Sequence, residues 1–185
     1  MGQQQFPLTS RILHWTMAVM VLAMLFIGIG MVASLSDYHR LIAIHKPLGI
    51  LILVLVTVRL VNRLVYPPPP LPATMPVIER LVINTSVALL YTLMFALPLV
   101  GWAMLSAADY PIVLYGALSL PPILSPDPAL YSVLRTAHSA LAFLLFATFI
   151  AHFSGAMMHA LIIRDGVFES MASWKRRLRK NLATE

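Results

Sequence analysis

The chain contains no cysteine among its 185 residues. This absence excludes disulfide bonds, cysteine-ligated iron–sulfur clusters and the covalent attachment of a c-type haem. Charged residues are also scarce, at 11%, whereas hydrophobic residues make up 59% and the mean hydropathy is +0.84. Soluble domains carry about 25% charged residues, so the composition indicates a protein that is solvated by membrane lipid.

The net charge of +6 does not by itself indicate a nucleic-acid-binding protein. Such proteins gather basic residues on one face with aromatic residues between them, whereas these basic residues lie at the ends of apolar runs. Lysine and arginine at such positions act as signals of membrane topology. We therefore expect membrane lipid as a partner and no nucleic acid.

Four apolar runs are long enough to cross a bilayer core about 30 Å thick, which takes roughly 20 helical residues. They cover approximately residues 12–35, 44–65, 77–105 and 134–163. A short connection, a proline-rich segment over 66–72 and a long loop over 106–131 join them. The sequence thus predicts an all-α membrane protein, a four-transmembrane-helix up-and-down bundle over 1–163, followed by a basic tail over 164–185.

The basic residues are divided unequally between the two ends of this predicted bundle. Ten lie at the end that carries the chain termini, and three, Arg40, Lys46 and Arg135, lie at the other. Because cytoplasmic flanks retain lysine and arginine, this bias predicts cytoplasmic termini in a bacterial inner membrane. The tail combines Met171 and Trp174 with five basic residues, so we expect an interfacial helix against anionic headgroups.

Ionisable side chains inside a membrane are costly, so five of the six histidines are functional candidates. The sixth, His39, is assigned to the short outer loop. His45 and His138 lie at one depth near the outer face, and His14 and His152 lie at another near the cytoplasmic face. The fourteen residues from His138 to His152 correspond to about 21 Å and nearly four full turns, so both lie on one helix face.

Two histidine pairs at two depths suit two b-type haems, each held by imidazole nitrogens from facing helices. We therefore predict that the axial ligands of two haem b groups are His14, His45, His138 and His152. A single membrane histidine is more often a helix-packing contact, but four that pair by depth and face favour ligation. Zinc or copper is the rival metal, although such sites gather three or four ligands at one level.

Other polar residues near the cytoplasmic pair are assigned to the cofactor or to quinone. Arg59 lies fourteen residues after His45, which places its cation at the inner level, where it suits a haem propionate. His159 follows the inner histidine of its run by seven residues and has three open roles, as a propionate contact, a quinone contact or a group that meets interfacial water. Arg164 lies about one turn further on. The predicted cofactor-binding residues are Arg59, Arg63, His159 and Arg164.

Together these residues resemble the bacterial cytochrome b561 family, which is related to the cytochrome b subunits of nickel–iron hydrogenases and formate dehydrogenases. The likeness covers nearly the whole chain. It rests on Arg11-Ile-Leu-His14-Trp15, on His45-Lys46, on Arg59-Leu-Val-Asn-Arg63 and the prolines after it, on Ala96-Leu-Pro98-Leu-Val-Gly101, and on His138, His152 and His159. The resemblance implies four helices and two haems, with ligand pairs His14 with His152 and His45 with His138.

The resemblance also implies a class of function. Some members resemble oxidases of superoxide at the outer surface that reduce ubiquinone, while hydrogenase-type relatives, which usually carry an additional helix, take electrons from a partner protein. We therefore expect an electron-transfer oxidoreductase that connects an outer donor, superoxide or a periplasmic redox protein, to ubiquinone. The alternatives are a relay subunit for a dehydrogenase or hydrogenase, and a histidine-lined metal or proton transporter without haem.

Overall fold

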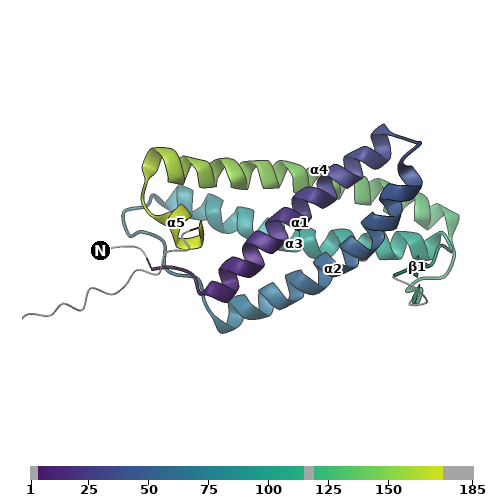
Figure 1. Cartoon of the computed structure of the whole chain (residues 1–185), viewed down its shortest axis with the longest axis horizontal. Coiled ribbons are helices and arrows are strands. Elements are labelled where there is room, and N and C mark those ends of the chain that lie inside the picture. Colours follow the sequence, from purple (N-terminus) through teal and green to yellow (C-terminus); the bar gives the residue numbers. More distant parts are fainter. Residues whose placement is uncertain (1–3, 115–118, 173–185) are drawn as a thin grey trace, which may run out of the picture.

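The computed structural model describes residues 4–114 and 119–172, and four long helices dominate it (Figure 1). All four are long and apolar enough to cross a membrane, which confirms the predicted four-helix architecture. In chain order the elements are α1 (Leu8–Ala33), α2 (Tyr38–Val65), α3 (Val77–Ala107), β1 (Ile112–Val113), β2 (Ser119–Leu120), α4 (Pro128–Met158), the π-helical turn η1 (His159–Ile163) and α5 (Val167–Ala172).

The helices run up and down along the long axis of an elongated bundle (Figure 1). Helix α1 packs against α2, α2 against α3, and α3 against α4. We call the end that holds the start of α1, the end of α4 and α5 the terminal end. The opposite end, which holds the α1–α2 turn and β1, is called the hairpin end (Figure 1).

Three helices begin four to six residues before the apolar runs that predicted them, at Leu8, Tyr38 and Pro128. Hydropathy marks the segment that crosses hydrocarbon, whereas backbone hydrogen bonding continues the helix into its polar flank. The assignment of His39 to a loop was therefore wrong, because this exposed residue lies in the first turn of α2.

Local chemistry explains where α4 begins and where α2 ends. The Asp127 side chain accepts hydrogen bonds from the backbone N–H groups of Ala129 and Leu130, at 2.9 and 3.1 Å, and Pro128 occupies the first turn. Helix α2 ends at Val65, and the prolines after Tyr66 provide no N–H donors with which to continue it.

The loop between α3 and α4 contains a small structure that hydropathy did not predict. Strands β1 and β2 pair antiparallel, with Ile112 opposite Leu120. The indole N–H of Trp102 on α3 donates to the carbonyl oxygen of Pro121 at 3.0 Å, and the N–H of Ile123 donates to Ser106 Oγ at 3.1 Å. These contacts hold the loop against the hairpin end of α3.

The protein core is small and the outer surface is apolar. Buried residues from all four helices form one cluster, Val21, Ile52, Leu93, Leu97 and Leu145. Large apolar side chains elsewhere remain exposed, among them Val19 at 67%, Phe143 at 76% and Ile162 at 78%. Such a surface requires lipid as its solvent, in agreement with four membrane-spanning helices.

The described part of the C-terminal tail folds back onto the terminal end. The N–H of Phe6 donates to the carbonyl of Ser170 at 3.0 Å, and the indole N–H of Trp15 donates to the carbonyl of Met171 at 3.3 Å. Short helix α5 is thereby tied to the start of α1. The rest of the predicted interfacial helix, including Trp174 and the five basic residues, lies outside the described residues.

Candidate functional site

The hairpin-end pair consists of His45 on α2 and His138 on α4. Their ring centroids are 6.2 Å apart and their planes are inclined by 64°. The Nδ1 atom of each ring is buried and has no hydrogen-bond partner among the described residues. Gly101 on α3 makes room for this arrangement, because a Cβ at that position would lie 3.2 Å from Cε1 of His138.

The terminal-end pair consists of His14 on α1 and His152 on α4. Their ring centroids are 6.4 Å apart and their planes are inclined by 66°. Arg59 on α2 lies at the same level, where its Nη2 donates to Nδ1 of His14 at 2.9 Å and its Nε donates to the hydroxyl of Tyr91 at 3.0 Å. The third guanidinium nitrogen, Nη1, is buried and has no partner in the described chain.

Both histidine pairs fit a metal ion held between two imidazoles. A metal that bonds one nitrogen of each ring at about 2 Å keeps the ring centres about 6 Å apart when the three are in line. Both observed separations match this geometry. Residues 4–114 and 119–172 contain no group of three or more His, Asp or Glu side chains that could hold a metal.

The structure thus brings the four histidines together in the two pairs that helix depth predicted, while their role as haem ligands stays a prediction. The four side chains also fit haem chemically, because b-type haem is commonly held by two neutral imidazoles. The unpartnered Arg59 Nη1 at the terminal end is a buried polar atom that an acidic group of a cofactor would satisfy.

A shallow cleft at the terminal end is bordered by Arg59, which contacts His14 of the terminal-end pair. Its polar wall contains two predicted residues, Arg59 and Arg63, whose guanidinium carbons lie 5.9 and 6.0 Å from the ring centre of Tyr91. Asn62 donates to Ser10 Oγ at 2.6 Å and completes this wall. Sequence reasoning missed Tyr91, although a tyrosine in the middle of an apolar run was a signal that could have indicated it.

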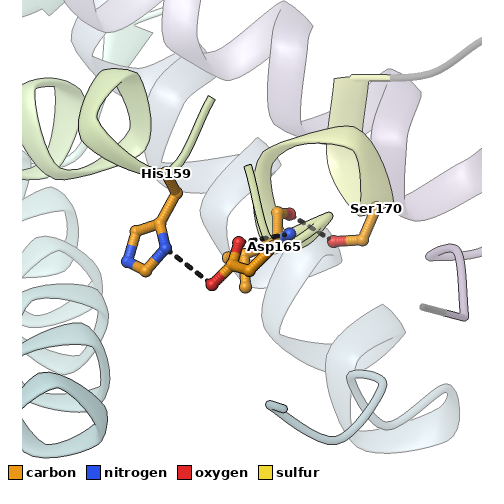
Figure 2. A network of polar contacts seen from close by, with 4 residues as sticks. His159, Asp165 and Ser170 are labelled. Carbon is orange, nitrogen blue, oxygen red and sulfur yellow. Dashed lines mark hydrogen bonds and ion pairs between the residues drawn. The ribbon is translucent and has the colours of Figure 1, made fainter. Parts of the chain in front are cut away.

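His159 lies at the end of α4, where the helix changes to the π-helical turn η1. Its side chain is only 4% exposed, and its Nδ1 is 2.9 Å from Oδ2 of Asp165 (Figure 2). The sequence reading placed Arg164 with His159, but the residue in contact with it is Asp165. Arg164 is exposed, and its Nε donates to the carbonyl of Leu161 at 3.0 Å. Asp165 was missed because its contact depends on a left-handed turn that hydropathy does not reveal.

Comparisons with known proteins show the family to which the chain belongs. A family model described as prokaryotic cytochrome b561 matches residues 5–174, which include all four long helices and α5. Cytochrome b561 homolog 2 of Escherichia coli (strain K12) is 30% identical over 172 residues, or 91% of each chain. The probable superoxide oxidase CybB of Yersinia pestis is 29% identical over 166 residues, which cover 89% of this chain and 93% of the relative.

Proposed function

Because the chain belongs to the prokaryotic cytochrome b561 family, we propose that it carries electrons between a donor at the hairpin end and membrane quinone at the terminal end. The chain is a multi-pass bacterial membrane protein, a transmembrane cytochrome b that binds b-type haem and transfers electrons.

The observation that carries the proposal is the placement of two imidazole pairs at two levels of one bundle. His138 and His152 both lie on α4, and their fourteen-residue separation corresponds to about 21 Å of helix. His45 and His138 would hold one haem, and His14 and His152 would hold the other. Haem held at these pairs would supply one-electron transfer. Ligation by two imidazoles would leave no open coordination position, which would favour electron transfer over oxygen binding.

Arg59 and Arg63 are proposed to neutralise haem propionates at the terminal end. An imidazole that bonds a metal through Nε2 carries its proton on Nδ1, so Nδ1 of His14 can no longer accept from Arg59. The guanidinium then needs a new acceptor, and its Nη1 already lacks one. A carboxylate satisfies both nitrogens, because arginine binds carboxylates in a two-pronged geometry.

The terminal end is proposed to face the cytoplasm of a bacterial inner membrane, because five of the eight basic residues within 4–114 and 119–172 belong to it, namely Arg11, Arg59, Arg63, Arg80 and Arg164. Quinone is amphipathic, so its headgroup is expected at this interface beside the terminal-end pair. His159 is proposed to contact a quinone carbonyl, and the exposed Arg164 adds positive charge nearby. Reduction of one quinone to quinol takes up two electrons from the donor side and two protons from the cytoplasm.

Superoxide is the proposed donor, since one relative is named as a probable superoxide oxidase. Two superoxide anions each lose one electron and leave as dioxygen, which supplies the two electrons that one quinone requires. Arg40, Lys46 and Arg135 belong to the hairpin end and provide positive charge that attracts an anion.

The test uses the purified protein in detergent, with superoxide generated by xanthine oxidase and with ubiquinone-1 as the acceptor. We expect the α and Soret bands of reduced b-type haem to appear, followed by one quinol for every two superoxide anions consumed. If superoxide leaves the haem bands unchanged, superoxide is not the donor, and a partner redox protein is favoured instead. A colourless protein would contradict haem binding itself and favour a transporter.

A further inference from the structure

The turn after α4 joins a buried imidazole to a partly exposed carboxylate. His159 is 4% exposed, whereas the side chain of Asp165 is 18% exposed, and 2.9 Å separates His159 Nδ1 from Asp165 Oδ2. Two residues with positive φ, Arg164 at 55° and Gly166 at 86°, reverse the chain so that Asp165 lies against His159. The turn η1 just before this reversal is π-helical, and π-helical turns occur frequently at functional sites.

Both oxygens of Asp165 have a defined partner. Oδ1 accepts from the backbone N–H of Val167 at 3.1 Å and so begins α5, while Oδ2 faces His159 (Figure 2). Helix α5 is fixed in turn by the hydrogen bond from Phe6 N–H to the carbonyl of Ser170. The carboxylate is therefore held in one orientation from two sides.

A carboxylate only accepts hydrogen bonds, so this contact requires a hydrogen on Nδ1 of His159. The other ring nitrogen, Nε2, points away from Asp165 (Figure 2). It is then the atom that takes up or releases a proton. A carboxylate that fixes the tautomer of a histidine in this way is a recurrent device in acid–base catalysis.

We propose that Asp165 is a positioning residue that directs the acid–base chemistry of His159 to Nε2, from which protons pass to membrane quinone. The inference rests on the proposed quinone contact of His159. Each proton moves from Nε2 of doubly protonated His159 to a quinone oxygen, and two such transfers accompany the two electrons that form quinol. His159 keeps its Nδ1 hydrogen on Asp165 throughout and regains the Nε2 proton from cytoplasmic water.

The decisive variant is Asp165→Asn. The amide oxygen of asparagine can still accept from Val167 N–H, which preserves the start of α5 and turns the amide NH₂ towards Nδ1 of His159. The asparagine NH₂ group donates, so Nδ1 of His159 must accept and the ring hydrogen moves to Nε2. Because Nε2 already carries this hydrogen, it can take up no further proton unless the contact between the asparagine and Nδ1 changes. The limiting rate of quinone reduction should fall at least about tenfold, while the half-saturating quinone concentration stays unchanged.

The assay mixes dithionite-reduced protein with ubiquinone-1 and follows haem reoxidation by stopped-flow spectroscopy. Haem content and the rate of haem reduction by dithionite should equal those of the wild type. Asp165→Glu, which retains an acceptor, should restore much of the rate and provides a second variant if Asp165→Asn folds poorly. Glu169→Gln is the matched control, because it removes an exposed carboxylate from α5 and should leave the rate unchanged.

A double-mutant cycle with His159→Ala distinguishes the positioning role of Asp165 from the quinone contact of His159. Asp165→Asn should cause no further loss in the His159→Ala background, since both substitutions disable one unit. A wild-type rate in Asp165→Asn, together with a slow His159→Ala, would overturn the positioning role and leave the quinone site intact. An equal further loss in the double variant would also overturn it. A wild-type rate in His159→Ala would refute the quinone contact and this inference together.

Discussion

The hairpin-end pair and the terminal-end pair contain the same side chains in different surroundings. At the hairpin end, His138 packs against the bare backbone of Gly101. At the terminal end, His14 accepts a hydrogen bond from Arg59, which also contacts Tyr91 and borders a cleft. One face of α4 therefore carries two imidazoles, one in surroundings shaped by close packing and the other in surroundings shaped by charge.

This difference indicates how two similar sites in one bundle can have different properties. A cation beside a redox centre favours the state that holds an additional electron, because the electron reduces the local positive charge. The terminal-end haem should therefore be the easier one to reduce. Electrons that enter at the hairpin end would then move towards the quinone side.

The largest expected effect is the loss of one haem at a time. His45→Ala should remove the hairpin-end haem and leave the other in place, because the ligands belong to separate levels. A pyridine haemochrome assay should show the haem-to-protein ratio fall from about two to about one. His39→Ala is the control, since this residue is exposed in the first turn of α2. Equal haem loss in the control would contradict the pairing.

A smaller effect is expected from a methyl group at Gly101. In Gly101→Ala the new Cβ would lie 3.2 Å from His138 Cε1, so the ring must shift. Overpacking of this kind costs about 1–2 kcal/mol, which corresponds to roughly five- to thirtyfold weaker haem affinity. Haem titration of the apoprotein measures the change. Gly155→Ala on α4 is the control, because its Cβ would meet nothing within 4 Å, and equal weakening in both variants would contradict the packing role.

The smallest effect concerns charge at the terminal end. Arg59→Leu should lower the midpoint potential of the terminal-end haem by about 60 mV, or about 1.4 kcal/mol for one electron, and leave the other potential unchanged. Arg59→Lys, which retains a cation, should shift it less. Potentiometric titration followed in the visible spectrum measures both haems, and an equal shift of both potentials would show that Arg59 does not distinguish the two sites.

Much of this arrangement could be predicted from the sequence, because helical periodicity and bilayer thickness restrict where a side chain lies. The spacings of His14, His45, His138 and His152 predicted both pairs, since straight helices convert residue number into depth. The Asp165 contact could not be predicted, because it depends on a left-handed turn and a π-helical end rather than on regular helix geometry.

The same limit applies to the polar network around Arg59. The depth of Arg59 in the bundle could be predicted from its position along the helix. Its hydrogen bond to Tyr91 depends on how α2 and α3 are rotated against each other. Rotation is determined by side-chain packing, which hydropathy does not specify. The β1–β2 pair was missed for a related reason, because strands of two residues are too short to show an alternating pattern.

The central claim is that electrons cross the bundle from the hairpin-end haem, through the terminal-end haem, to quinone. The most direct test is His152→Ala, which should remove only the terminal-end haem, supplied with superoxide and ubiquinone-1. The remaining haem should still be reduced by superoxide at the wild-type rate, and quinol formation should stop. Quinol formation at the wild-type rate in this variant would contradict the account, because it would show that quinone accepts electrons without the terminal-end haem.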